Sequence, residues 1–101
     1  MLKLEDTYNP DCEYELWAIG YDKDSMIVPM EEQIGETATD EEEFLEMCAE
    51  AKSMTVDMLR EMFAEQIKKY NITSIQIQIE ELTEDDGEIL GEPVYENQFD
   101  L

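Results

Sequence analysis

The chain has 101 residues, of which 28 are Asp or Glu, 6 are Lys or Arg and none is His, so its net charge at pH 7 is −22. Hydrophobic residues still make up 43% of the chain and aromatic residues 9%, a content typical of a folded domain rather than of a disordered acidic tail. The charge excludes nucleic acid and anionic membranes as direct partners, because phosphate groups are bound by Lys and Arg. The absence of His excludes His-based catalysis and His-ligated metal sites.

The length predicts one domain over residues 1–101, with loose ends at about residues 1–10 and 97–101. No apolar run approaches the roughly 20 residues that span a membrane, and the N-terminal sequence MLKLEDTYNPD lacks the apolar segment of a secretion signal. We therefore expect a protein of the bacterial cytoplasm. There the two cysteines, Cys12 and Cys48, would be reduced and buried; a disulfide between them is the alternative.

The charge is unevenly distributed along the chain. Residues 1–51 hold 16 acids and 2 bases, a net −14, and residues 80–101 hold 9 acids and no base, a net −9. Residues 52–79 hold 3 acids and 4 bases, a net +1. The middle segment is typical of an amphipathic scaffold, so the excess charge lies on either side of it.

The first predicted element is a strand from Cys12 to about Ile19, because its residues alternate with a period of two. One face would carry Cys12, Tyr14, Leu16 and Ala18, and the other Glu13, Glu15, Trp17 and Ile19. A turn at residues 20–25 leads to a second short strand at residues 26–28, which Pro29 ends or limits to a sheet edge. Residues 31–38 are expected to form a loop.

One long helix is predicted next, over about residues 40–70. Thr39 and Glu42 match a capping box ahead of a run of apolar residues at helical spacing. Residues 53–55 mark a point where the helix would kink or break, and Asn71 supplies a C-terminal stop.

A second hairpin follows the predicted helix. Ile75, Ile77 and Ile79 alternate with polar residues, which predicts a strand, and Asp86-Gly87 favours a tight turn into a return strand that begins at Ile89. The predicted order is therefore β-β-α-β-β. This is an α+β fold of two layers, in which one long helix packs on an antiparallel sheet.

Few residues suggest chemistry. Runs of acids are typical of solvated faces, and no Ser or Cys sits in a nucleophile motif, so we expect no enzyme and no cofactor. An EF-hand loop beginning at Asp22 would put Ile27 where glycine is needed, and one beginning at Glu84 would put Gly87 two positions early. No specific metal site is therefore expected. Core packing is the favoured role for the tryptophan and six methionines: Trp17, Met26, Met30, Met47, Met54, Met58 and Met62.

The charge itself is the strongest functional observation. At the duplex spacing of one charge per 1.7 Å, 22 charges correspond to about 37 Å of DNA, which is close to the diameter expected of a compact domain of this length. The chain resembles the small acidic DNA-mimic proteins of phages and mobile elements, which include anti-restriction and anti-CRISPR proteins. The resemblance lies in size, charge and mixed α/β content, and matches no signature motif. It implies a stoichiometric inhibitor that blocks the nucleic-acid channel of a nuclease.

Our leading hypothesis is accordingly an acidic inhibitor that occupies the basic nucleic-acid groove of a host defence nuclease, such as a CRISPR effector or a restriction enzyme. Its partner would be a basic nucleic-acid-binding protein, held by charge-assisted hydrogen bonds to Arg and Lys. The candidate binding residues fall at the predicted helix start, in the second hairpin and in the first hairpin: Asp40, Glu41, Glu42, Glu43, Glu46 and Glu50; Glu80, Glu81, Glu84, Asp85, Asp86 and Glu88; Glu13, Glu15, Asp22 and Asp24.

Two alternatives remain open at this point. The first is an acidic protein-interaction or regulatory module, such as an antitoxin-like partner, that does not mimic nucleic acid. The second is a cation-binding or salt-adapted domain. Competition with nucleic acid separates the first alternative from mimicry, and calorimetry with calcium tests the second.

Overall fold

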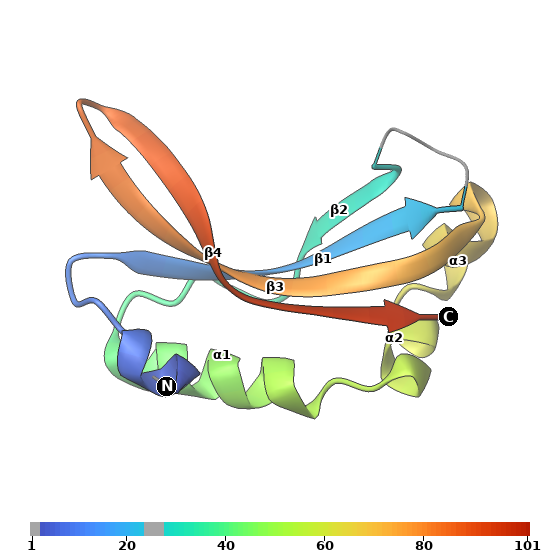
Figure 1. Ribbon diagram of the computed structural model, residues 1–101, viewed down its shortest axis with the longest axis horizontal. Helices are drawn as coiled ribbons and strands as arrows, with labels where there is room; N and C mark the ends of the chain where they lie inside the picture. The colour runs from blue at the N-terminus through green and yellow to red at the C-terminus, as the bar shows by residue number, and fades with distance from the viewer. Residues whose placement is uncertain (1–2, 24–27) are drawn as a thin grey trace.

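The computed structural model of the protein describes residues 3–23 and 28–101, and in it three helices cover one face of a four-stranded antiparallel sheet (Figure 1). The strands lie in the order β2-β1-β3-β4. The predicted α+β class is confirmed. The elements are the 3-10 helix η1 (Leu4–Thr7), β1 (Glu13–Asp22), β2 (Met30–Gln33), α1 (Glu41–Ser53), α2 (Val56–Met62), α3 (Ala64–Tyr70), β3 (Ile72–Asp85) and β4 (Glu88–Asp100).

The core lies between the helices and the central strands β1 and β3. The predicted alternation of β1 is confirmed, because Tyr14, Leu16 and Ala18 are at most 1% exposed and face the helices. The β3 residues Ile75, Ile77 and Ile79 are fully buried on the same face, and α1 adds four buried residues: Phe44, Met47, Cys48 and Ala51. Hydrophobic burial on one face of the sheet therefore leaves the other face open.

The predicted single helix over residues 40–70 is wrong, and with it the order β-β-α-β-β, because three helices separate the two pairs of strands. The break at residues 53–55 is confirmed: Met54 is extended and buried, and the Thr55 hydroxyl accepts the Met58 N–H to cap α2. A second break falls at the buried Phe63. A straight helix of that length would measure about 46 Å, whereas the longest dimension of the molecule is 39 Å. The breaks let the helices follow the curved sheet.

The second strand lies later in the chain than predicted. Val28 precedes it, and Met26 and Ile27 lie outside the described residues. β2 occupies residues 30–33, of which 31–33 fall within the stretch expected to be a loop. β2 pairs with residues 17–20 of β1 at the sheet edge, where one side of the strand stays open to water and charged side chains are tolerated. Pairing with β1 therefore forms a strand here, although the polar local sequence predicted a loop.

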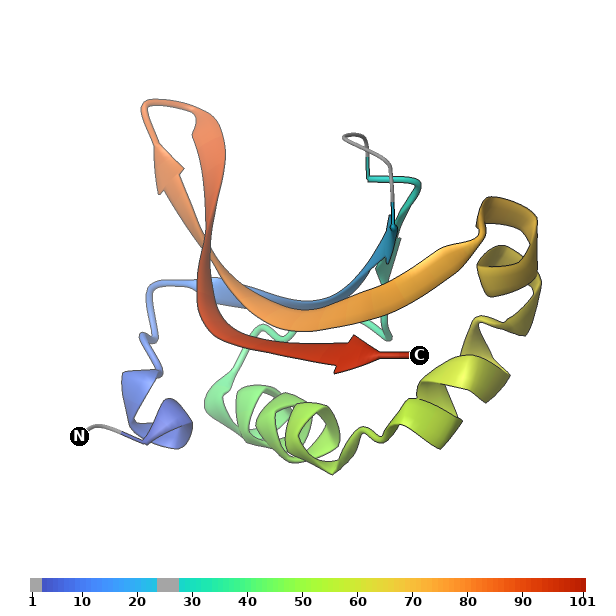
Figure 2. The same ribbon diagram turned by 45° about the vertical axis from the view of Figure 1, so that its right-hand side comes forward.

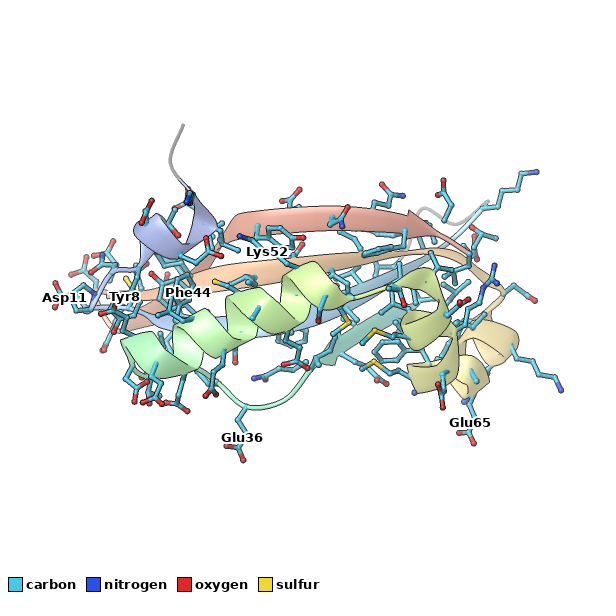
Figure 3. All side chains as sticks on the ribbon, turned by 90° about the horizontal axis from the view of Figure 1, so that it is seen from below. Tyr8, Asp11, Glu36, Phe44, Lys52 and Glu65 are labelled. Atoms are coloured by element: carbon cyan, nitrogen blue, oxygen red, sulfur yellow. The ribbon has the colours of Figure 1, made fainter. Side chains whose placement is uncertain are left out.

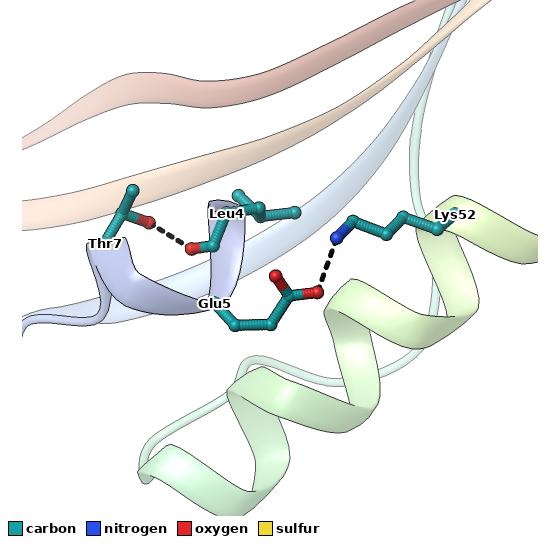
Figure 4. Close-up of polar contacts among 4 residues, drawn as sticks. All are labelled: Leu4, Glu5, Thr7 and Lys52. Atoms are coloured by element: carbon teal, nitrogen blue, oxygen red, sulfur yellow. Dashed lines mark hydrogen bonds and ion pairs between the residues drawn. The ribbon is translucent and has the colours of Figure 1, made fainter. Parts of the chain in front are cut away.

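Both ends of the chain make contacts with the body of the protein where the structure describes them, and the predicted looseness of residues 1–10 and 97–101 stays a prediction. β4 continues to Asp100, and the Leu101 N–H donates to the Thr73 carbonyl at 2.9 Å. Leu4 is buried in η1. Lys52 forms an ion pair with Glu5 that ties η1 to α1 (Figure 4), and this contact lowers the pKa of Glu5 and raises the pKa of Lys52. Leu4 and Leu101 thus pack on the core, which the polar local sequence did not indicate.

The sheet is strongly curved, with the helices on its convex side and a concave open face (Figure 2). The β3–β4 register shifts between Ile79 and Glu80, and beyond this point the hairpin rises away from the helices. Irregularities of this kind bend and twist strands. The outer half of the hairpin therefore stands clear of the body of the protein.

Candidate functional site

The acids at the start of α1 lie on an open surface. Glu41, Glu42, Glu46 and Glu50 are all exposed. Glu42, Glu46 and Glu50 follow one another at intervals of four residues, which places their carboxylates in a row with a rise of about 6 Å per step. Such a row presents negative charge at regular spacing along one side of the helix.

Two of the predicted binding residues on α1 also hold the helix together. Asp40, not Thr39, is the N-cap, and its side chain accepts the Glu43 N–H at 2.8 Å. The Glu43 carboxylate reaches back to the Thr39 hydroxyl at 2.8 Å and to its backbone N–H at 3.2 Å. The capping box therefore begins one residue later than predicted, and these two carboxylates have structural partners.

A groove of about 240 Å³ runs beside α1 and gathers acids from two segments. Its lining includes Glu43, Glu46 and Glu50 of α1 and Glu36 of the preceding loop. Figure 3 shows Glu36 projecting from the molecule on this side. Glu36 was absent from the predicted site because residues 31–38 were considered only as a loop, and only the folded chain brings it beside α1.

The β3–β4 hairpin carries the second set of acids. Glu84, Asp85, Asp86 and Glu88 at its tip are exposed. Asp86 and Gly87 both have positive φ, 50° and 83°, as the predicted tight turn requires. Two exposed apolar residues accompany these acids, because Ile89 is 74% and Leu90 49% exposed.

The two other predicted residues of this hairpin are engaged by neighbours. Glu81 is half-buried on the helix side of the sheet, where its carboxylate accepts the Tyr14 hydroxyl at 2.8 Å. Glu80 lies on the concave face and accepts the Gln78 amide at 2.7 Å. Glu81 therefore has a structural partner within the chain, and its role in partner binding stays a prediction.

The predicted residues of the first hairpin do not form one group. Glu13 is exposed on the concave face, and Glu15 accepts hydrogen bonds from the Trp17 indole at 3.3 Å and the Thr37 hydroxyl at 3.2 Å. Asp22 is half-buried at the end of β1. Asp24 lies outside the described residues, so its prediction stays a prediction.

An aromatic cluster joins the start of α1 to the base of the hairpin. The ring of Tyr8 lies 5.5 Å from that of Phe44 and 5.9 Å from that of Tyr14, centre to centre. Burial raises the pKa of Tyr8, and the nearby charges of Glu41 and Asp40 raise it further. The Tyr14 hydroxyl in turn donates to Glu81 of β3.

The start of α1 and the hairpin lie at the same end of the molecule (Figure 1), and we call the surface there the acidic end. Its exposed acids are Asp11, Glu13, Glu41, Glu42, Glu46, Glu50, Glu84, Asp85, Asp86 and Glu88.

Little positive charge offsets these acids. Among the described residues, one ion pair forms, between Lys52 and Glu5. Arg60 lies in α2, and Lys68 and Lys69 lie in α3, the helices at the opposite end of the molecule from the hairpin tip (Figure 1). The acidic end therefore presents its charge to solvent largely without partners from the same chain.

The acids of the described residues form no metal-binding group, and both cysteines are buried. Within residues 3–23 and 28–101, no group of three or more Cys, Asp or Glu side chains is arranged to hold a metal ion. Both cysteines are free and buried, as predicted. Burial raises the pKa of Cys12, and it raises the pKa of Cys48 to about 11, so both thiols are held in the unreactive protonated form near neutral pH.

Three further results bear on function. No helix in the described part of the chain is long and apolar enough to cross a membrane. No known family model matches the chain. Comparisons with curated proteins and with solved structures also give no match. The distribution of charge and of exposed side chains is therefore the guide to function.

Proposed function

We propose that the protein is an inhibitor that mimics the charge of nucleic acid and occupies a basic nucleic-acid-binding groove of another protein, most simply a host defence nuclease. The acidic end would be its principal binding surface. Arg and Lys side chains that normally hold phosphates would instead donate charge-assisted hydrogen bonds to its carboxylates. Bound in this way, the protein would exclude nucleic acid from the groove.

The observation that supports the proposal is the amount of charge for the length of the molecule. The net charge of −22 lies on a body whose longest dimension is 39 Å. A DNA duplex 39 Å long carries about 23 charges at one per 1.7 Å. The protein therefore carries about as many negative charges per unit length as the duplex that such a groove binds. The row of Glu42, Glu46 and Glu50 places three of these charges at regular intervals.

The proposal is tested with two variants of equal charge. Glu42→Lys/Glu46→Lys/Glu50→Lys reverses the row on α1. Asp57→Lys/Glu61→Lys/Glu65→Lys reverses three exposed acids with the same spacing on α2 and α3; of these, Glu65 is seen to project from the molecule in Figure 3. Each protein is immobilised and exposed to a bacterial lysate, and captured proteins are eluted with duplex DNA.

We expect the parent and the α2–α3 variant to capture a basic nucleic-acid-binding protein, and we expect duplex DNA to elute it. The α1 variant should fail to capture this protein. The purified target should then lose its binding of labelled DNA when the parent protein is added. Capture that duplex DNA does not reverse, or that the α1 variant matches, would overturn the mimic proposal.

A second candidate function is an acidic protein-interaction module that does not mimic nucleic acid. The exposed Ile89 and Leu90 near the hairpin tip favour it, because apolar side chains at a protruding tip suit a protein surface better than a phosphate-binding groove. For such a module the captured protein would resist elution by DNA, and Ile89→Ser would weaken its capture.

A further inference from the structure

The concave face of the sheet is an unpartnered surface with a tryptophan at its centre. Register places Trp17 of β1 between Gln33 of β2 and Gln78 of β3, and Glu96 of β4 lies beyond Gln78. Trp17 is outside the core, although the sequence favoured core packing, and it remains partly exposed. Helices cover only the opposite face (Figures 1 and 2), so no described element covers this indole.

Acids surround Trp17 on this face of the sheet. Glu15 is two residues away on β1, Glu31 lies across from Ile19 on β2, and Glu80 lies across from Glu15 on β3. Trp17, Ile19, Glu31 and Glu80 line one pocket of about 120 Å³. The pocket therefore combines an aromatic surface, an aliphatic side chain and two carboxylates.

Hydrogen bonds hold the groups around this pocket in place. Gln76 donates to Gln78 at 3.2 Å, and Gln78, only 8% exposed, donates to Glu80 at 2.7 Å. Trp17 donates its indole N–H to Glu15 at 3.3 Å. The second oxygen of Glu80 lies 3.0 Å from where a Cβ would stand on Gly91, so the missing side chain at Gly91 leaves room for the carboxylate. This arrangement exists before any partner arrives.

From this geometry we propose that the concave face binds an arginine side chain of a partner protein, with the guanidinium stacked on the Trp17 indole and paired with Glu31 and Glu80. Charge complementarity selects a cation. The planar guanidinium stacks on an aromatic ring and donates hydrogen bonds to carboxylates in its own plane, whereas an ammonium is a compact, strongly hydrated point charge. Arginine is therefore expected to be preferred over lysine.

This inference does not rest on the proposed nucleic-acid mimicry. The pocket lies on the sheet face opposite α1, and it recognises a single side chain rather than the spacing of a phosphate-binding groove. An inhibitor of a nuclease and an interaction module of another kind could each use it. Its failure and the failure of the mimic proposal are consequently separate results.

Trp17 is the only tryptophan of the chain, so its fluorescence reports this pocket directly. The full-length protein is titrated with an arginine-rich peptide and with a lysine-rich peptide of equal length and charge. We expect the arginine peptide to change the tryptophan emission and to bind about five-fold more tightly than the lysine peptide. Binding that leaves the emission unchanged, or equal affinity for both peptides, would overturn the proposal.

Matched variants locate the effect. Glu31→Gln/Glu80→Gln removes two charges from the pocket, and Glu42→Gln/Glu46→Gln removes two from α1; affinities are measured by calorimetry, with unfolding curves to verify folding. The pocket variant should lose the preference for arginine and the α1 variant should keep it. Trp17→Leu should also abolish the preference, and Trp17→Phe should retain part of it. Loss of the preference in the α1 variant, or its survival in Trp17→Leu, would contradict the assignment.

Gly91→Ala provides a subtler variant. Its Cβ would press against the Glu80 carboxylate, while no charge is lost and the aromatic surface is unchanged. We expect weaker binding of the arginine peptide with an unchanged affinity for the lysine peptide. An unchanged arginine affinity would show that the position of Glu80 does not matter and would remove Glu80 from the site.

Discussion

Tyr14 connects the core to the acidic end. Its side chain is 0% exposed, and its ring lies 4.2 Å from that of Phe44, centre to centre. Its hydroxyl accepts the Asn9 N–H and donates to the Glu81 carboxylate, both at 2.8 Å. One buried hydroxyl thus holds the N-terminal segment and β3 together, and it binds the half-buried carboxylate of Glu81.

Removing this hydroxyl should destabilise the protein. Tyr14→Phe keeps the ring packing but removes the hydrogen bonds of the hydroxyl to the Asn9 N–H and to the Glu81 carboxylate, which is expected to lower the free energy of unfolding by about 1–3 kcal/mol. Urea unfolding measures the change. Tyr70→Phe is the control, because Tyr70 is 37% exposed; its effect should stay within about 0.5 kcal/mol. Equal effects of the two variants would show that the Tyr14 hydrogen bonds do not contribute.

Cys48 makes stability sensitive to alkaline pH. Burial raises its pKa from 9.0 to about 11, so the folded state keeps the thiol proton at pH values where the unfolded chain has lost it. The resulting stabilisation is complete below the unfolded pKa and is lost as pH rises through the folded one. The free energy of unfolding should therefore fall between about pH 9 and pH 11. Cys48→Ala should reduce this fall in urea unfolding under reducing conditions; a fall of undiminished size would assign it to other groups.

The tip of the β3–β4 hairpin carries a pair of like charges that destabilises it. Asp85 and Glu88 are directly opposite each other across its tip, and like charges in such a pair repel. The turn residues are less free to change, since Asp86 and Gly87 occupy the left-handed region. Because the acids at the tip do not stabilise the fold, their presence fits the proposal that they bind a partner.

Reversing one charge of this pair should stabilise the hairpin. Asp85→Lys places a cation opposite Glu88, which is expected to raise the free energy of unfolding by about 0.2–1 kcal/mol. Asp85→Lys/Glu88→Lys restores a like-charged pair and should remove the gain. Urea unfolding of both variants tests this, and a greater stability of the double variant would show that the gain comes from lower net charge alone. Under the mimic proposal, both variants should bind the captured target more weakly.

Charge repulsion also acts across the entire molecule. With a net charge of −22 and few ion pairs among the described residues, the folded state brings together charges that the unfolded chain keeps farther apart. Salt screens this repulsion, because the Debye length falls from about 30 Å at 0.01 M to about 3 Å at 1 M.

Stability at pH 7 should therefore increase with sodium chloride over that range, as measured by the thermal midpoint. The variant Asp57→Lys/Glu61→Lys/Glu65→Lys carries six fewer net negative charges, since each of its three substitutions changes the charge by two, and it should show a smaller increase. A thermal midpoint that does not change with salt would mean that the acids are compensated within the fold, and the mimic proposal would then lose its physical basis.

Several local features were predictable from the sequence because neighbouring residues decide them. The alternation of residues 12–19 predicted which face of β1 is buried, the Asn71 stop was correct with φ of 54°, and Asp86-Gly87 marked the hairpin turn. The exposed acids at the start of α1 and at the hairpin tip were also predicted. Each of these follows from backbone preferences or hydrophobic periodicity within a few residues.

Long-range contacts determined the rest. Sheet pairing forms β2 from a polar segment, the buried Met54 and Phe63 lie where the predicted helix is interrupted, and the Tyr14 hydroxyl binds Glu81. Core packing was favoured for Trp17, although the alternation of β1 already placed it on the face of Glu13 and Glu15; only the tertiary structure shows that the helices lie on the opposite face (Figure 2). The charge of this protein is thus evident from its composition. Which carboxylates are free, and which surround the exposed indole, depends on strand register and curvature, which arise only when distant segments pack together.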